Sequence, residues 1–129
     1  MQRPLPASEA DKFDVISLSL VLNYVPDPAE RGEMLRRAAL FLREGTDGLF
    51  PSLFLVLPLP CIANSRYLDE KRLAEMMASL GYVQARRKLS QKLIYGLWRL
   101  DARQKEGLKW KKEEVNPGKN RNNFAITLK

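Results

Sequence analysis

Residues 13–28, which read FDVISLSLVLNYVPDP, constrain the fold of this chain more than any other segment. The segment opens with large and β-branched apolar residues, as is typical of a strand buried on both faces in a parallel sheet. It then passes through serines into prolines that suit the start of a helix. We therefore predict a strand over residues 13–20 with a ligand-facing tip at its carboxyl end. Because only the polar lead-in 1–12 comes before it, we expect the preceding strands of such a sheet to be missing.

A helix is predicted to follow this strand directly. Asp27 can cap its first turn, Pro28 fits its first position, and Glu30 has the spacing of a capping box. Gly45 is predicted to end the helix. Its apolar face consists of residues at helical spacing, namely Leu35, Ala38, Ala39 and Leu42.

The rest of the chain predicts further strands and one more helix. The expected elements are a buried strand over 51–58, a helix over about 68–80 ended by Gly81, a polar strand near a sheet edge over 82–89, an alternating strand over 92–100, and a last strand over 122–128. For residues 92–100 a helix stays open as the alternative. The second helix has a core face of Leu73, Met76, Met77 and Leu80. This order of elements predicts an α/β fold that begins with a parallel βαβ unit.

Charge is distributed unevenly along the chain. Residues 1–83 carry a net charge of −2, whereas residues 84–129 carry +9. A nearly neutral body with a basic C-terminal third is typical of a surface that faces a polyanion, with nucleic acid the first candidate. Charge alone leaves open the alternative of a solvated basic tail.

Several classes of site are excluded by composition. The chain has no histidine and a single cysteine, Cys61, which rules out a His-based triad, a zinc site and an internal disulfide. The longest apolar run, residues 53–59, is too short to span a membrane. We therefore expect no metal and no membrane partner.

Three segments resemble one family closely. Residues 13–37, 55–70 and 115–126 are similar to the fungal 25S rRNA adenine-N1 methyltransferases. The resemblance implies a Rossmann-like, class I AdoMet-dependent fold, of which residues 13–129 would be the second half, with the last strand antiparallel. It also implies methylation of adenine N1 in large-subunit ribosomal RNA, in the nucleolus.

The resemblance implies S-adenosyl-L-methionine as the cofactor, but its site is incomplete here. The family has an upstream glycine-rich loop, and none of the seven glycines of this chain forms a G-x-G cluster. The candidates that remain for cofactor contact are at the predicted strand tip: Ser17, Ser19 and Leu20. The alternative is that these residues only pack the strand end.

Asn23 and Tyr24, just beyond the tip, are the candidate catalytic residues. A carboxamide can pair with an adenine edge, and an aromatic ring can stack on a base. The stretch from Asn23 to Pro26 echoes the Asn/Asp-Pro-Pro-aromatic motif of amino-methylating enzymes only weakly. The alternative is that Asn23 satisfies loop backbone groups while Tyr24 lies in the core.

Candidate RNA contacts combine cations with one aromatic residue. They are Arg66, Arg86, Arg87, Lys88, Lys92, Lys109, Trp110, Lys111, Lys112, Lys119 and Arg121. Such a mixture suits a structured RNA better than a small anion. Arg66 has the open alternative of a structural role at a helix start.

Two other functions stay open at this point. The chain could be a non-catalytic AdoMet-binding regulatory protein on the same scaffold, since animal relatives of the family resemble metabolite sensors. It could also be an inactive truncated fragment. The unpaired edge of the strand over 13–20 predicts a partner that completes the sheet, either a second chain or a missing N-terminal half.

Overall fold

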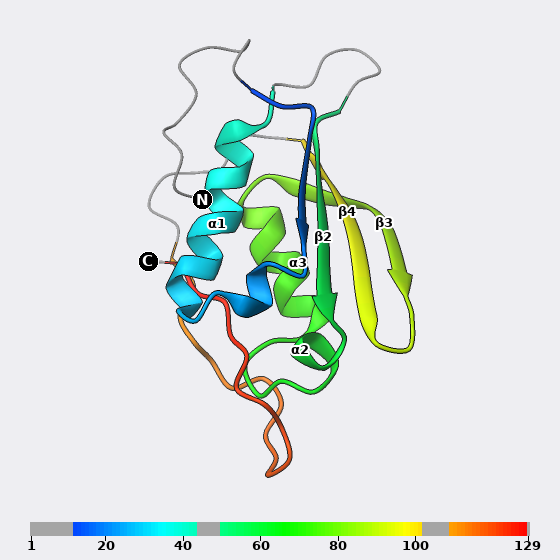
Figure 1. Cartoon of the computed structure of the whole chain (residues 1–129). Coiled ribbons are helices and arrows are strands. Elements are labelled where there is room, and N and C mark those ends of the chain that lie inside the picture. Colours follow the sequence, from blue (N-terminus) through cyan, green and yellow to red (C-terminus); the bar gives the residue numbers. More distant parts are fainter. Residues whose placement is uncertain (1–11, 44–49, 102–108, 129) are drawn as a thin grey trace.

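The computed structural model describes residues 12–43, 50–101 and 109–128. Four strands form one sheet in the order β1-β2-β4-β3 (Figure 1): β1 Val15–Ser19, β2 Ser52–Pro58, β3 Tyr82–Leu89 and β4 Leu93–Leu100. β1 pairs in parallel with β2, and β4 runs antiparallel to both of its neighbours. The predicted α/β fold with an antiparallel strand is confirmed, and the polar strand β3 lies at an edge as expected.

α1 spans Pro28–Phe41 and begins as predicted, since the Asp27 carboxylate accepts a hydrogen bond from the amide of Ala29 at 2.9 Å. The prediction that Gly45 ends this helix is wrong, because α1 ends at Phe41 and Leu42 is already extended. Near the end of the helix, the Phe41 carbonyl accepts a hydrogen bond from the amide of Phe13 at 2.8 Å, and this contact turns the chain toward the sheet. Gly45 itself lies outside the described residues.

Three shorter helical segments complete the fold. A 3-10 turn, η2, covers Leu22–Tyr24, α2 covers Pro60–Ala63, and α3 covers Glu70–Ser79. The sequence did not predict α2. α3 is capped by Asp69, and it is followed by Gly81 with φ of 96°, so Gly81 ends the helix as predicted.

α1 and α3 lie on the same side of the sheet (Figure 1), and the core fills the space between. The two predicted apolar faces are confirmed as buried: Leu35, Ala38, Ala39 and Leu42 on α1, and Leu73, Met76, Met77 and Leu80 on and just after α3. Alternate residues of β4 are buried against these helix faces. The buried hydroxyl of Tyr82 donates a hydrogen bond to the carbonyl of Leu35 at 3.0 Å. Burial strongly raises the pKa of this phenol, so it remains a neutral donor.

The prediction of a last strand over 122–128 is wrong. This segment makes only isolated bridges. Residues 109–128 instead lead from Trp110 through a turn at 119–120 and back to Leu128, which pairs with Trp110, and the returning part lies beside α1 (Figure 1); we call residues 109–128 the C-terminal strap. Its residues Phe124, Ala125, Ile126 and Leu128 are buried outside the sheet. The strap bonds to the first turn of α1 through the Thr127 amide and the Pro28 carbonyl, 3.0 Å apart. The apolar residues of this segment are therefore buried outside the sheet, while β4 occupies the antiparallel position in it.

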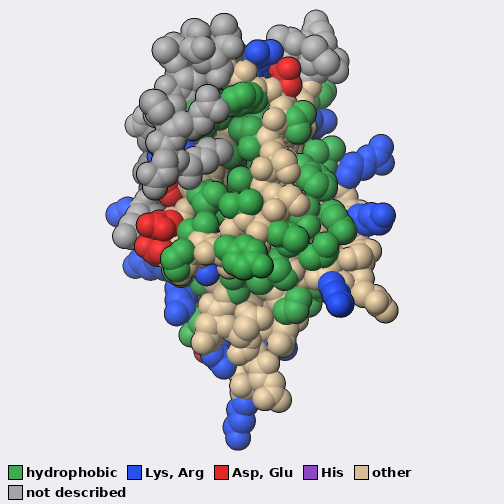
Figure 2. Space-filling view, viewed as in Figure 1, with side chains coloured by type: hydrophobic (Ala, Val, Ile, Leu, Met, Phe, Trp, Pro, Cys, Tyr) green, Lys and Arg blue, Asp and Glu red, His purple; other side chains and the backbone are tan. Residues whose placement is uncertain are grey.

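The sheet face opposite α1 and α3 carries no described helix. β1 is therefore buried on one face only, contrary to the prediction, and the side chain of Val15 is 63% exposed. Hydrophobic side chains gather on this side of the molecule (Figure 2), and the rings of Phe54 and Tyr95 stack there with centroids 6.3 Å apart. The outer edge of β1 is also the edge of the described sheet. None of the described helices is both long and apolar enough to cross a membrane.

Candidate functional site

The parallel strands β1 and β2 end at the same edge of the sheet, where their following loops meet. η2 follows β1, and α2 with the loop over 64–67 follows β2 (Figure 1). Ser17 and Ser19 alternate with the buried Leu18, so both hydroxyls lie on the open face of the sheet. The structure thus places the two predicted cofactor-contact serines at the end of β1, on the open face of the sheet.

Two departures from ordinary structure occur within four residues of the β1 tip. Leu20 has φ of 58°, and it alone among the described non-glycine residues has a positive φ. Asn23 has a buried Oδ1 with no hydrogen-bond partner among the described residues. Each costs free energy, roughly 1–3 kcal/mol, and such departures cluster at binding and active sites. The β1 tip therefore holds one buried acceptor that no described residue satisfies.

Tyr24 is 81% exposed, so the alternative that placed it in the core is wrong. Its ring stands at the surface beside the strand tip, in the position that a base-stacking residue needs. The structure therefore places a carboxamide and an exposed ring side by side in η2.

Arg31 fixes the loop that carries these two residues. Its Nε donates to the Val25 carbonyl and its Nη1 to the Ala125 carbonyl, both at 2.7 Å, and its guanidinium lies 4.3 Å from the ring centroid of Phe124. Burial lowers the pKa of Arg31. No local sequence signal could reveal a partner 94 residues away.

Cys61 of α2 does not supply a nucleophile at this edge. Burial raises the pKa of its half-buried thiol, and the positive charge of Arg31 opposes the shift only in part. At neutral pH the thiol therefore stays protonated and unreactive.

The loop after α2 is tied to the C-terminal strap through Ser65. This residue is fully buried, and its hydroxyl donates to the Phe124 carbonyl at 2.5 Å and accepts from the Tyr67 amide at 3.1 Å. A Ser65→Ala change leaves both backbone groups without this partner. We expect a loss of about 1–3 kcal/mol in the free energy of unfolding, measured by chemical denaturation.

Ser19→Ala is the matched control for this change, because Ser19 is exposed. Its free energy of unfolding should stay within about 0.5 kcal/mol of the wild-type value. Equal effects of the two substitutions would show that Ser65 does not hold the strap.

Arg66 follows Ser65 and lies at the same edge. Its Nη1 donates to the Asn123 side-chain oxygen at 2.5 Å, and its Nη2 donates to the Gly118 carbonyl at 2.7 Å. Both acceptors are neutral, so the positive charge of Arg66 is retained.

The basic residues of β3 are divided between the two faces of the sheet. Arg86 and Lys88 pair with Leu97 and Tyr95 on the open face. Arg87 lies on the helical face, where its guanidinium binds both carboxylate oxygens of Glu70 at 2.6 and 2.5 Å. The predicted group of Arg86, Arg87 and Lys88 is therefore not a single surface.

Trp110 of the strap packs against the core. Its indole nitrogen donates to the Ser79 hydroxyl at 3.0 Å, and the guanidinium of Arg72 lies 5.1 Å from its ring centroid. Its neighbours Lys109, Lys111 and Lys112 are exposed. The strap and β3 lie on opposite sides of the molecule (Figure 1), so the predicted RNA contacts fall into two separate groups.

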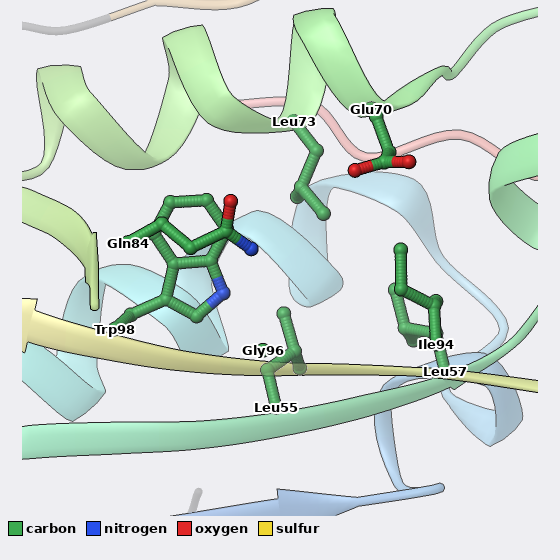
Figure 3. Close-up of a pocket in the computed structure, with 8 residues that line it drawn as sticks. All are labelled: Leu55, Leu57, Glu70, Leu73, Gln84, Ile94, Gly96 and Trp98. Carbon is green, nitrogen blue, oxygen red and sulfur yellow. The ribbon is translucent and has the colours of Figure 1, made fainter. Parts of the chain in front are cut away.

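A small pocket between α3 and the sheet is not part of this site. Glu70 and Leu73 approach it from the helix, while Gln84 and Trp98 approach from the strands (Figure 3). Its volume of about 20 Å³ admits roughly one water molecule. Among the described residues no group of three or more metal-ligating side chains lies together.

Comparison with known proteins shows which family the sequence matches. The model of the family "25S rRNA (adenine(2142)-N(1))-methyltransferase, Bmt2" matches residues 1–126. This chain belongs to that family. The resemblance inferred from three separate segments of the sequence is therefore confirmed.

Two curated relatives in this family are similar to the chain over most of its length. The chain is 41% identical over 129 residues to the 25S rRNA (adenine(2142)-N(1))-methyltransferase of Saccharomyces cerevisiae, covering 99% of this chain and 37% of that protein. It is 42% identical over 118 residues to the 25S rRNA adenine-N(1) methyltransferase of Schizosaccharomyces pombe, covering 92% of this chain and 43% of that protein. The chain thus spans about two fifths of the length of these relatives.

Proposed function

We propose that this chain acts in the methylation of adenine N1 in large-subunit ribosomal RNA, with AdoMet as the methyl donor. The family match over residues 1–126 carries the proposal. The unsatisfied Asn23 oxygen and the exposed Tyr24 ring at the β1 tip support it. An rRNA substrate would place this work in the nucleolus.

The chain carries only part of a cofactor site. The hydroxyls of Ser17 and Ser19 and the backbone of Leu20 would contact AdoMet at the β1 tip, but no glycine-rich loop is present in the sequence. When bound, AdoMet supplies a methyl group on a sulfonium that is already activated, so no metal is required. We therefore assign cofactor binding mainly to a part of the enzyme that this sequence does not contain.

The described residues would orient the adenine. Tyr24 would stack on the base, and the carboxamide of Asn23 would accept a hydrogen bond from the exocyclic amine. Adenine N1 attacks through its own lone pair, so alignment and exclusion of water contribute more than a strong base. A site without histidine is chemically sufficient for this step.

The test joins this chain to the part of the Saccharomyces cerevisiae relative that lies outside the matched segment; we call the product the joined protein. It is incubated with unmethylated 25S rRNA and AdoMet, and the digested RNA is analysed by mass spectrometry. We expect 1-methyladenosine. If the intact relative produces 1-methyladenosine and the joined protein produces none, the proposed function is wrong.

The 129-residue chain alone is expected not to bind AdoMet measurably. Its described residues offer hydroxyls at the β1 tip but no glycine-rich loop to hold the rest of the cofactor. Isothermal titration calorimetry of the chain with AdoMet should show no saturable heat. Tight one-to-one binding would contradict this division of the cofactor site.

We also propose that another segment or chain completes the sheet at β1. The exposed side chain of Val15 and the outer edge of β1, which pairs with no other described strand, support this, because uncovered strand edges pair readily. Amide exchange of Val15–Ser19 should be slower in the joined protein than in the isolated chain.

A further inference from the structure

We propose that four cations at the carboxyl edge of the sheet bind backbone phosphates of the RNA substrate beside the target adenine. We call them the basic rim: Arg66, Lys112, Lys119 and Arg121. The inference rests on the proposed function, and it names the part of the surface that contacts the substrate.

Arg66 is held rigidly in place at this edge. Its side chain makes the two hydrogen bonds to Asn123 and Gly118, and its amide donates to the Asn122 carbonyl at 2.9 Å. Its carbonyl accepts from the amides of Val115 and Asn116, at 2.8 and 3.1 Å. A guanidinium fixed in this way presents its charge with little ordering left to be done on binding.

The other three cations are tied to the same loop by contacts with its neighbours. The Lys112 ammonium lies 4.3 Å from the ring centroid of Tyr67, and Arg121 donates to the Ala63 carbonyl at 3.4 Å. Lys119 lies between Gly118 and Asn120 in the sequence. The Gly118 carbonyl accepts a hydrogen bond from Arg66, and the Asn120 carbonyl accepts one from the side chain of Asn64 at 3.1 Å. The cluster is therefore a single local surface.

The basic-rim residues have no acidic partner among the described residues, unlike several arginines elsewhere on the molecule. Ion pairs with carboxylates are formed by Arg36, Arg43, Arg72, Arg87 and Arg99. No described carboxylate lies within ion-pair distance of a basic-rim residue. Glu113 of the strap is paired with Arg72, and Glu114 is the other acidic residue in the described strap. The basic rim thus keeps most of its positive charge for a polyanion.

A continuous set of contacts connects the basic rim to the β1 tip. Asn123, which binds Arg66, is followed by Phe124, whose carbonyl binds Ser65 and whose ring lies under Arg31. Arg31 in turn holds Val25, the residue after Tyr24. Phosphates on the rim would therefore lie beside a base placed at Tyr24.

The test measures the salt dependence of RNA binding by the 129-residue chain. The probe is a fluorescein-labelled RNA hairpin with an unpaired adenosine in its loop, titrated at several salt concentrations. The variants are Arg66→Gln and Lys119→Gln. Arg86→Gln on β3 is the matched control, since it removes the same charge from the open face.

We expect each rim variant to weaken binding and to reduce the slope of log affinity against log salt by about one. Arg86→Gln should leave the slope unchanged. Asn123→Ala, which keeps the charge but releases Arg66, should weaken binding about threefold, because the guanidinium must then be ordered on binding. Thermal unfolding of each variant checks that the fold is retained.

The proposal is overturned if the chain does not bind the hairpin, or if Arg66→Gln and Arg86→Gln reduce the slope equally. The proposed function fails separately. If the rim variants reduce the slope as expected while the joined protein forms no 1-methyladenosine, the basic rim stands and the methyltransferase assignment does not.

Discussion

Gly32→Ala is expected to destabilise this chain by about 1–3 kcal/mol and to displace the C-terminal strap from α1. A Cβ at Gly32 would lie 1.9 Å from the Thr127 carbonyl oxygen and 2.8 Å from a methyl group of Leu128. Alanine would by itself favour the helix by about 1 kcal/mol relative to glycine. The clash is the larger effect, because the nearest atom belongs to the backbone and cannot rotate away.

The measurement combines chemical denaturation with amide exchange. The Leu128 amide donates to the Trp110 carbonyl at 2.9 Å, and it should exchange faster in the variant than in the wild type. The amides of β2 should keep the same ranking of exchange rates among themselves as in the wild type. Ala78→Gly on the exposed side of α3 calibrates helix propensity and should cost about 1 kcal/mol. A Gly32→Ala protein that is more stable than the wild type would show that the strap does not lie against α1.

The parts of the fold that sequence predicted are those with local causes. The Asp27 cap, the glycine at position 81 and the alternation of β4 each depend on a few neighbouring residues, and each is confirmed. The edge position of β3 followed from its polarity in the same way.

The strap shows what local pattern cannot decide. The apolar residues over 122–128 indicate a buried segment, but they do not say whether a sheet or a helix covers it. The answer depended on Gly32, a residue far away in sequence that allows the strap to approach α1. No periodicity in the chain carries that information.

The same limit applies to the candidate site. Its location at the β1 tip followed from strand order, and the pairing of β1 with β2 is consistent with it. The roles of individual cations did not follow. Glu70 neutralises Arg87 and Arg31 bridges two loops, whereas Arg66 is bound only by neutral oxygens, and these differences arise from contacts distant in sequence.

Asn23→Ala is expected to reduce methylation by the joined protein about 5- to 150-fold. This corresponds to the loss of one good hydrogen-bond pairing with a base, roughly 1–3 kcal/mol. Its stability should stay equal to that of the wild type or rise slightly. The buried Oδ1 of Asn23 has no partner among the described residues, so its removal breaks no described hydrogen bond and relieves an unsatisfied acceptor. Single-turnover methylation and thermal unfolding measure the two effects separately.

Asn64→Ala is the matched control, since its side-chain amide donates to the Asn120 carbonyl at 3.1 Å and supports the loop beside the basic rim. This substitution should lower stability by about 1 kcal/mol. The opposite pattern at position 23, a loss of stability with methylation retained, would make Asn23 a structural residue. Low activity in a stable Asn23→Ala protein would instead mean that the Asn23 oxygen has no partner in the free chain because its partner is the substrate.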